Sequence, residues 1–408
     1  MTVITIERLG HKGDGIAPGP VFVPGALPGE EVSGEIDGGV MAAPRIVTPV
    51  PERVRPPCAH AKSCGGCQLQ HASDSFVEGW KTEVVRRALE AHDLTTEIRP
   101  CVTSSPQSRR RASFSARRTK KGALAGFHQK SSDVIVSVPH CQLVTPALAL
   151  SLPMVEALAV LGSSRKGELS VLVTESLSGL DVAVNGGKEV DTALRTALAD
   201  LARQFDLARL AWDDEVISRR PPFQRFGKAD VIPPPGAFMQ ATAEGEAALL
   251  AAVREALGPL SRTAKVADLF AGCGTFALPL AQDVRVHAVE GDREMIKALD
   301  HGWRNAEGLK LVTHETRDLF RNPLMLDELD RLDGVVIDPP RAGAEAQIVE
   351  IARARVPRVA HVSCNPVTFA RDCATLVRSG YVLDFVQVVD QFRWSTHVEV
   401  VAGLHLAD

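Results

Sequence analysis

From about residue 265 to the end of the chain, short apolar runs of strand-forming residues alternate with helical segments. The runs are KVADLF, VRVHAVEG, LKLVTHE, GVVIDPP and RVAHVSC, and YVLDFVQVVD and HVEVVAGLHL follow them. Strands that alternate with helices predict βαβ units and a doubly wound parallel sheet, because parallel neighbours need a crossover connection. We therefore predict an α/β, Rossmann-like domain over residues 236–408, with a hairpin at the end of the sheet.

Small and acidic residues follow the strands of this predicted sheet. The segment DLFAGCGTFALPLA reads as a strand, a turn with Gly272 and Gly274, and a helix that starts at about residue 275. Glu290 ends the next strand, where a carboxylate can accept hydrogen bonds from ribose hydroxyls, and Asp318 and Asp338 end the two after it. A single Asp there is best interpreted as a loop cap. The ordered set favours a ligand site at the carboxyl edge.

The spacing of the glycines restricts the class of ligand that this turn can bind. Thr275, Phe276 and Ala277 follow Gly274, so the turn is not the G-x-G-x-x-G of dinucleotide binders, and no phosphate-binding lysine is present. An adenosyl group without a pyrophosphate fits better. S-adenosylmethionine is the commonest ligand of that kind, so the sequence predicts a methyltransferase domain.

A cysteine and a carboxylate fall on the same predicted edge. Cys364 lies in VSCNP after the fifth strand, and Glu399 lies in HVEVV in the last. Methylation of uracil at carbon 5 needs a thiolate that adds to carbon 6 and a base that removes the carbon 5 proton. Cys364 and Glu399 suit these roles, with His361 and His397 as further candidates for orientation. The alternative for a lone strand-end cysteine is a small buried hydrophobe, and Cys373 is interpreted in that way.

A second group of cysteines lies near the amino terminus. Cys58, Cys64 and Cys67 form C-x5-C-x2-C, and Cys101 or Cys141 could be a fourth soft ligand. Four thiolates suit either zinc or an iron–sulfur cluster, and the spacing does not decide between them. Cys141 follows a predicted strand and is the better anchored of the two.

The rest of the chain divides into two further regions. Residues 1–50 contain short strands between closely spaced Gly and Pro, which predicts a small OB-like β-barrel. Residues 51–235 read as a central α+β domain with a helix over about 74–92. A stretch between Arg99 and Ser132 is rich in Lys and Arg, lacks Asp and Glu, and contains Phe114 and Phe127. A solvated basic loop and an RNA-binding segment explain it equally well.

Length and composition exclude some classes. The 408 residues carry a net charge of −4, and no apolar stretch is long enough to span a bilayer. The first residues lack the basic and apolar parts of a signal peptide, so we expect a cytoplasmic protein that does not bind membranes. Its cysteines are too unevenly placed for a disulfide framework.

Together these motifs resemble the RNA uracil-5 methyltransferases, specifically the subtype with a [4Fe–4S] cluster. HKGDGIAPGPVFVPGALPGEEV is similar to the TRAM domain, an OB-like RNA-binding barrel. CAHAKSCGGCQLQH with the later PHCQLV is similar to the cluster motif, which implies Cys58, Cys64, Cys67 and Cys141 as metal ligands. The resemblance also implies that a helix over 74–98 packs on the catalytic domain.

The resemblance extends through the catalytic motifs. PGAFMQ implies that Gln240 contacts the cofactor and that Phe238 lies near the base of the substrate. DLFAGCGTF implies that Phe270 and Thr275 lie at the cofactor, where Glu290 and Asp338 join them. VSCNPVTFARD and STHVEVV imply Cys364 as the nucleophile and Glu399 as the catalytic base. The expected partner is RNA, with 23S ribosomal RNA ahead of transfer RNA, and the expected assembly is a monomer.

The sequence departs from the family pattern in places. Thr275 stands where many members have Asn, and DQFRWSTHVE replaces the usual DMFPHTxHVE, with Gln391, Arg393 and Trp394 in place of common residues. Two other classes remain open at this point. One is a methyltransferase for cytosine or an exocyclic amine, although Arg341 in DPPRAG stands where cytosine enzymes have their cysteine. The other is a non-catalytic RNA-binding protein with a degenerate cofactor site.

Overall fold

The computed structural model describes residues 2–407, and its first part is a small all-β region. It contains β1 (Thr2–Thr5), β2 (Arg8–Leu9), β3 (Asp14–Ala17), β4 (Val21–Pro24), β5 (Glu31–Gly34) and β6 (Arg45–Thr48). These strands form two three-stranded antiparallel sheets, in the orders β1-β5-β6 and β2-β3-β4. Residues from both sheets, including Ala17, Val23 and Val32, share one core, which makes the region a single packing unit.

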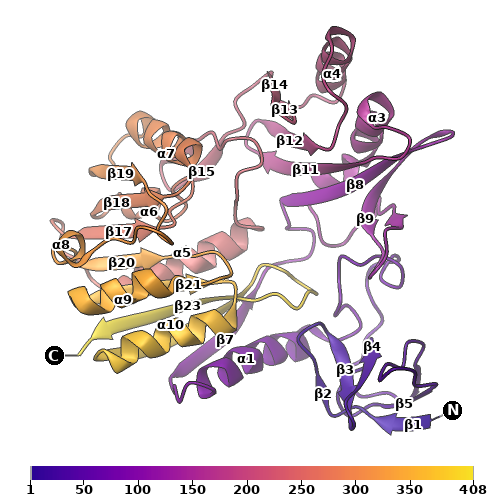
Figure 1. The fold of residues 1–408 in the computed structure, drawn as a ribbon, viewed down its shortest axis with the longest axis horizontal. Helices are drawn as coiled ribbons and strands as arrows, with labels where there is room; N and C mark the ends of the chain where they lie inside the picture. Colours follow the sequence, from indigo (N-terminus) through magenta and orange to yellow (C-terminus); the bar gives the residue numbers. More distant parts are fainter. Residues whose placement is uncertain (1, 408) are drawn as a thin grey trace.

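The central region is built on a seven-stranded sheet with the order β10-β9-β8-β11-β12-β13-β14 (Figure 1). The strands are β8 (Arg111–Thr119), β9 (Gly122–His128), β10 (Ile135–Val136), β11 (Glu168–Ser176), β12 (Gly179–Asn185), β13 (Arg209–Trp212) and β14 (Glu215–Ser218). The helices are α2 (Pro146–Leu150), α3 (Leu152–Gly162) and α4 (Thr192–Gln204). A two-stranded sheet of β15 (Gln224–Phe226) and β16 (Ala229–Val231) leads into the last region.

The last region is an eight-stranded sheet with the order β19-β18-β17-β20-β21-β23-β22-β7. Its strands are β17 (Lys265–Leu269), β18 (Arg285–Glu290), β19 (Val312–Thr316), β20 (Gly334–Ile337), β21 (Arg358–Ser363), β22 (Tyr381–Asp390), β23 (Glu399–Leu406) and β7 (Glu97–Thr103). Strands β17 to β21 are parallel, and β23 runs antiparallel to both of its neighbours. The predicted doubly wound sheet and terminal hairpin are both present.

Helices cover both faces of this sheet (Figure 1). One core contains residues of α1 (Asp74–Glu90), α9 (Glu345–Ala354) and α10 (Pro366–Arg378), and α8 (Leu326–Leu329) joins them. The other core contains residues of α5 (Ala243–Leu257), α6 (Ala277–Leu280) and α7 (Arg293–Asn305). The strands between them are apolar on both sides, as β20 shows with four buried residues, which is typical of a parallel sheet covered on both faces.

The amino-terminal segment of the predicted central domain belongs to the eight-stranded sheet instead. Strand β7 pairs in parallel with β22, and α1 contacts α10 and β22. The helix thus packs on the last region, as the resemblance implied, and the range 51–235 is not one continuous domain, because residues 74–103 complete the large sheet and its helical layer. The helix assigned to 74–98 also ends earlier, at Glu90, and a turn leads into β7 at Glu97.

None of the helices within residues 2–407 is both long enough and apolar enough to cross a membrane.

Candidate active site

The glycine turn after β17 has the backbone geometry that a close ligand approach requires. Gly272 and Gly274 have φ of 57° and 95°, and Phe270 also has a positive φ, of 63°. A left-handed backbone strains a non-glycine residue, and such strain concentrates at functional sites. Glu290, at the end of β18, accepts a hydrogen bond from the Gly272 backbone N–H at 2.9 Å, so it braces this turn. The helix expected to start near residue 275 is only the four residues of α6, which begins at Ala277.

The other predicted cofactor residues lie around this turn. Phe270 and Thr275 are partly exposed within it, and the Phe270 ring lies 5.4 Å from that of Phe320, centroid to centroid. Phe320 is 50 % exposed and was not anticipated. Asp318 is exposed and accepts a hydrogen bond from the Phe320 backbone N–H at 3.0 Å. Asp318 therefore positions Phe320, and the two aromatic rings form an apolar wall beside the glycine turn.

Cys364 lies in the turn between β21 and α10. Asn365 caps α10 by accepting a hydrogen bond from the Val367 backbone N–H, and its side-chain amide donates to the Arg341 carbonyl at 2.9 Å. Pro366 follows at the first position of the helix, where its missing N–H costs nothing. The SCNP sequence thus fixes the turn locally, and it ties that turn to the loop after β20.

Glu399 faces this turn from the neighbouring strand. Ser363 pairs with Val400 in the antiparallel β21–β23 ladder, so Cys364 and Glu399 occupy the next position of the same register. The pKa of Cys364 is raised to about 11, mainly by burial, with the charges of Glu399 and Asp338 adding to the shift and Arg341 opposing it. Burial also raises the pKa of Glu399 to about 8, with Asp338 adding to the shift, and raises that of Asp338 to about 7. The structure therefore gathers one thiol, two carboxyl groups and one guanidinium at the carboxyl edge of the sheet.

Gln240 lies at the rim of this group but is 3 % exposed. Its side-chain oxygen accepts a hydrogen bond from the Gln391 amide at 2.5 Å. Phe238, in contrast, is 63 % exposed. The segment that contains both residues leads into α5, whose amino terminus is capped by Thr242.

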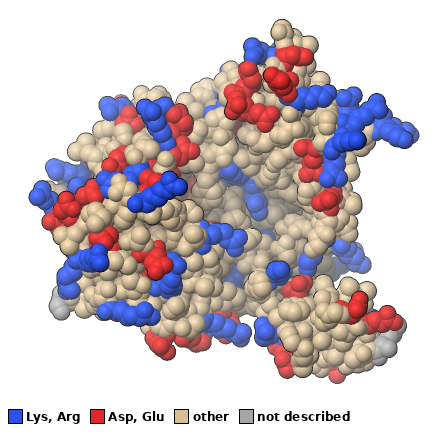
Figure 2. Space-filling view, viewed as in Figure 1, with Lys and Arg blue, Asp and Glu red and all other residues tan. Residues whose placement is uncertain are grey.

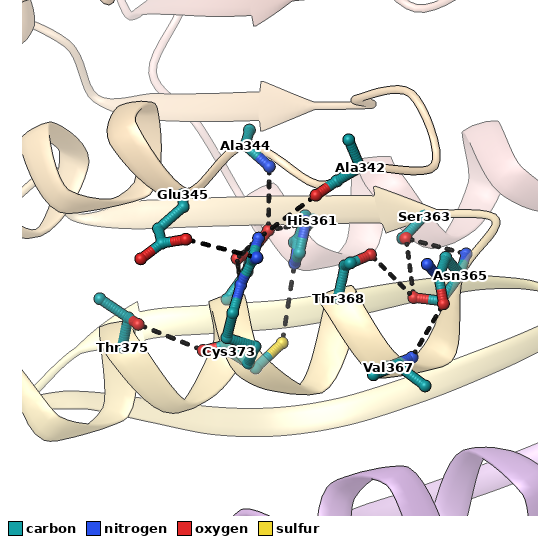
Figure 3. A network of polar contacts seen from close by, with 12 residues as sticks. Ala342, Ala344, Glu345, His361, Ser363, Asn365, Val367, Thr368, Cys373 and Thr375 are labelled. Atoms are coloured by element: carbon teal, nitrogen blue, oxygen red, sulfur yellow. Dashed lines mark hydrogen bonds and ion pairs between the residues drawn. The ribbon is translucent and has the colours of Figure 1, made fainter. Parts of the chain in front are cut away.

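His361 does not join the site. It lies beneath the edge, between β21 and α10, where Figure 3 shows it pointing toward Cys373. The Cys373 sulfur lies 3.7 Å from His361 Nδ1, Asp372 lies 3.9 Å from His361 Nε2, and all three residues are buried. Burial lowers the pKa of His361 to about 4 and raises that of Cys373 well above its ordinary value, so both are neutral. The orientation role predicted for His361 is wrong, because the ring packs α10 onto the sheet. His397 is exposed, 5.7 Å from the Phe392 ring.

The amino-terminal cysteines gather elsewhere, around one cavity. Cys58, Cys64, Cys67 and Cys141 all line it, whereas Cys101 lies on β7 near Lys81 and Asp390. Backbone N–H groups lie 3.4 Å from three of the sulfurs, from His60 to Cys58, from Gly66 to Cys64 and from Leu143 to Cys141. The cavity measures about 20 Å³, close to one water molecule. No group of three His, Cys, Asp or Glu side chains in residues 2–407 is arranged to hold a metal ion.

The basic stretch splits into two parts. Arg110 pairs with Glu246 at 2.6 Å, and Arg111 donates to the carbonyls of Gly236 and Ala237, so these arginines join the central region to the catalytic one. Phe114 is buried and stacks on Phe127, so it is not free to stack on a base.

The remaining basic residues are exposed. Arg118, Lys120 and Lys121 lie at the tip of the β8–β9 hairpin, which projects from the molecule in Figure 1. Figure 2 shows Lys and Arg on this projection and in the walls of a hollow between the central and catalytic regions.

The open parallel sheet, the glycine turn and the acids at its carboxyl edge define a Rossmann-like, S-adenosylmethionine-dependent methyltransferase. A family model described as tRNA (Uracil-5-)-methyltransferase matches residues 233–407. The chain belongs to the family of S-adenosylmethionine-dependent RNA (uracil-5-)methyltransferases, and it is therefore an enzyme.

Relatives match over nearly the whole chain. An uncharacterised RNA methyltransferase of Rhizobium meliloti is 44 % identical, with 98 % of each chain covered. The 23S rRNA (uracil(1939)-C(5))-methyltransferase RlmD of Shewanella piezotolerans is 30 % identical, with 99 % of this chain and 95 % of the relative covered. The structure of Pyrococcus abyssi tRNA (uracil-54, C5)-methyltransferase with S-adenosyl-L-homocysteine has a TM-score of 0.77 at 22 % identity, with 98 % and 99 % covered. That likeness shows a common fold.

Sequence reasoning missed two residues of the edge. The positive charge of Arg341 lowers the pKa values of Cys364 and Glu399. Its position directly after DPP was the sequence feature that could have identified it. Gln391 donates a hydrogen bond to Gln240 and accepts one from the Ala241 backbone N–H, and only its departure from the family pattern marked it.

Proposed function

We propose that this enzyme forms 5-methyluridine in 23S ribosomal RNA, with Cys364 as the nucleophile and Glu399 as the base. The observation that carries the proposal is that Cys364, directly after β21, and Glu399, the first residue of β23, lie next to each other and beside Asp338. Amine methylation needs no thiol, and a cytosine enzyme would present its cysteine where Arg341 stands.

The first step makes uracil reactive. The Cys364 thiolate forms a bond to carbon 6, and the electrons of the carbon 5–carbon 6 double bond move toward oxygen 4 as an enolate. Carbon 5 then attacks the methyl group of the sulfonium donor, whose carbon–sulfur bond breaks, and neutral S-adenosylhomocysteine leaves. The ring is now attached to Cys364 and carries both a methyl group and a proton at carbon 5.

The second step releases the product. Glu399 takes the carbon 5 proton, the double bond forms again, and the bond between carbon 6 and sulfur breaks to return the thiolate. The thiol of Cys364 and the carboxyl of Glu399 both have a raised pKa in the free enzyme. A cationic methyl donor beside them favours their anions, as a nearby positive charge does for any acid. Donor binding therefore prepares both groups for reaction.

The donor site that we propose follows the glycine turn. Glu290 would bind the ribose hydroxyls, Phe270 would lie against the adenine with Thr275 nearby, and Asp318 would support this wall through Phe320. Asp338 and Gln240 would lie at the amino-acid end, close to Cys364 and Glu399. Glu290 already uses both oxygens on the Gly272 and Asp292 backbone N–H groups at 2.9 Å, so its remaining lone pairs would serve the ribose.

We also propose that Cys58, Cys64, Cys67 and Cys141 hold a [4Fe–4S] cluster. The donor set fits, because four thiols line one cavity and three of them have backbone N–H groups nearby, which stabilise thiolates. The loop that contains Cys58, Cys64 and Cys67 and the separate segment that contains Cys141 approach the cavity from two parts of the chain. Because methyl transfer involves no net electron transfer, the cluster would supply a cross-link between this loop and Cys141.

The other regions would bind the RNA. The all-β region over residues 2–50 would serve as a TRAM-type barrel, and the exposed hairpin tip with Arg118, Lys120 and Lys121 would contact phosphates. Basic side chains gather in the walls of the hollow between the central and catalytic regions, which suits a polyanionic substrate (Figure 2). A uridine must leave its stack to expose carbons 5 and 6, and the exposed Phe238 would pack against the flipped base.

The test is transfer of labelled methyl groups from S-adenosylmethionine to unmodified 23S ribosomal RNA and to unmodified transfer RNA in parallel, with nucleoside analysis. We expect 5-methyluridine in the ribosomal RNA alone, as the relative from Shewanella piezotolerans supports. The second candidate substrate is transfer RNA, which the fold of the Pyrococcus abyssi enzyme favours. Label in transfer RNA alone would overturn the ribosomal assignment, and label in any other nucleoside would overturn the reaction.

A further inference from the structure

Phe238 is the one large side chain of residues 236–241, here called the platform segment, that faces solvent. It is 63 % exposed, whereas its neighbours Ala237 and Met239 are 8 % and 5 % exposed. Both neighbours belong to the buried core that also contains Cys273 of the glycine turn. A ring that lies mostly in water gains little from packing, so its position depends on what holds the backbone around it.

Arg111 clamps the backbone directly before Phe238. One terminal nitrogen of its guanidinium donates to the Ala237 carbonyl, and the other donates to the Gly236 carbonyl at 2.9 Å. The planar guanidinium presents its donors in a fixed geometry, so one side chain can hold two successive carbonyls. Hydrogen bonds from a charged donor are roughly twice as strong as those from a neutral one. The clamp therefore restrains the backbone that leads into the ring.

Arg110 fixes the backbone after Phe238. Its backbone N–H donates to the Ala241 carbonyl at 3.0 Å, and its side chain donates to the Gln240 carbonyl at 3.3 Å. The Gln391 side chain accepts a hydrogen bond from the Ala241 N–H at 2.8 Å. This half of the platform segment therefore has three hydrogen bonds of its own.

The two arginines belong to the central region, whereas the platform segment leads into the catalytic one. Arg111 is the first residue of β8 and pairs with Thr174 of β11. The Arg110 carbonyl accepts a hydrogen bond from the Glu175 N–H at 2.8 Å. Both arginine backbones are therefore fixed by the seven-stranded sheet. A loop that is tied to a sheet has fewer conformations to lose when a ligand binds.

We propose that Arg111 is a positioning residue that holds the Phe238 ring in the orientation that stacks on the flipped uracil. The proposal rests on the role proposed for Phe238 in binding the target base. Stacking on an aromatic ring stabilises a bound base, and the cost of ordering a free loop would be subtracted from that gain. The clamp orders the backbone before the RNA binds, so a residue of the central region supports base binding in the catalytic region.

The test compares Arg111→Lys with Arg220→Lys. Lysine keeps the charge but carries one ammonium group on a flexible stem, so it cannot hold two carbonyls in a fixed geometry. Arg220 is a matched control, because its guanidinium also donates to two backbone carbonyls, of Ser178 and Asp206, at 2.9 and 2.7 Å. Phe238→Ala should lower kcat/KM for RNA by about tenfold to a hundredfold, and Arg111→Lys by about tenfold. Arg220→Lys should keep the wild-type value.

The double variant with Arg111→Lys and Phe238→Ala separates positioning from a direct phosphate contact. An arginine that acts through the ring has nothing to position once the ring is gone, so adding Arg111→Lys to Phe238→Ala should change kcat/KM by less than about twofold. A full tenfold loss in that background would overturn the positioning role. Wild-type kcat/KM in Arg111→Lys would also overturn it, because a phosphate contact survives replacement by lysine.

Hydrogen exchange tests the clamp without any substrate. Arg111→Lys should speed amide exchange in peptides that contain residues 236–241, and Arg220→Lys should not. Unchanged exchange in Arg111→Lys would overturn the positioning role, whatever RNA the enzyme methylates. Absence of 5-methyluridine in RNA treated with the wild-type enzyme would instead overturn the proposed function, and with it uracil as the ligand of the ring.

Discussion

The carboxyl edge of the large sheet and the cysteine-lined cavity both gather sulfur, but they surround it with different chemistry. At the edge, Cys364 faces the carboxyl groups of Glu399 and Asp338 and the guanidinium of Arg341. In the cavity, four thiols face one another and backbone N–H groups, and burial raises the pKa of Cys67 to about 12. A free thiol in such a cavity is a poor nucleophile, whereas several thiolates become stable together once a metal binds.

The difference shows that the partners of a cysteine decide its role. Cys373 illustrates the point, since His361 and Asp372 beside it resemble a catalytic set, yet all three are buried beneath the edge. Cys364, by contrast, is partly exposed at the carboxyl edge of the sheet, beside the carboxyl group of Glu399. Exposure to a ligand and a neighbouring carboxyl group, rather than a nearby histidine, therefore distinguish Cys364 from Cys373.

The largest expected effect is that of Cys364→Ala. Without the thiolate, uracil carbon 5 is not nucleophilic, so turnover should fall by at least about 10⁴-fold and the covalent adduct should disappear. Methyl-transfer assays and denaturing gels of enzyme–RNA mixtures measure both. Cys373→Ala is the matched control, with near-normal activity and a loss of about 1–2 kcal/mol in unfolding free energy, from the small cavity it leaves. Substantial activity in Cys364→Ala would exclude the covalent mechanism.

The next effect is that of Glu399→Gln, which should slow turnover by about 10²–10⁴-fold while the adduct accumulates. The wild-type kcat should rise with pH, because Glu399 removes the carbon 5 proton as a carboxylate and burial raises its pKa to about 8. A rate profile that is flat from pH 6 to 9 would contradict this assignment.

The carboxyl group of Glu399 also affects the free energy of unfolding. Its pKa in the folded protein lies above the ordinary value, so the native state binds the proton more tightly than the unfolded state. Stability should therefore fall as the pH rises from the ordinary value toward 8. In chemical denaturation at several pH values, Glu399→Gln should be less dependent on pH over that window.

Substitution in the cavity should act more weakly on the chemistry. Cys67→Ala should lower the iron content of anaerobically purified protein and its absorbance near 400 nm, while methyl transfer falls about tenfold through loosening of the cysteine loop. Cys101→Ala is the control and should keep its iron, because Cys101 lies outside the cavity. Stoichiometric zinc and no iron in the wild-type protein would overturn the cluster.

The smallest effect is expected at the hairpin tip. Changing both Lys120 and Lys121 to Glu should weaken RNA binding severalfold and reduce the salt dependence of the binding constant by about two phosphate contacts. Adduct formation at saturating RNA should not change. Changing both Arg203 and Arg331 to Glu, with side chains 75 % and 86 % exposed, alters the net charge by the same amount and serves as the control. Equal losses in both variants would mean that only net charge matters.

Much of the catalytic region could be predicted from the sequence. The alternation of strands and helices, the glycine turn and the acids after successive strands are local patterns, and they gave the sheet and its carboxyl edge. The resemblance singled out Cys141 over Cys101 for the cysteine group, and the structure brings that residue to the same cavity. The basic stretch could not be divided in this way, because Arg110 and Arg111 find their partners more than a hundred residues away.

The sequence by itself determined the order of the strands along the chain and the residue types at their ends, since both follow from local hydrophobic periodicity and turn chemistry. Only the tertiary structure decided that β7 joins the catalytic sheet beside β22, that His361 lies beneath the site, and that Gln391 pairs with Gln240. These are contacts between segments far apart in the chain. Their geometry depends on how packed layers meet, which no local pattern records.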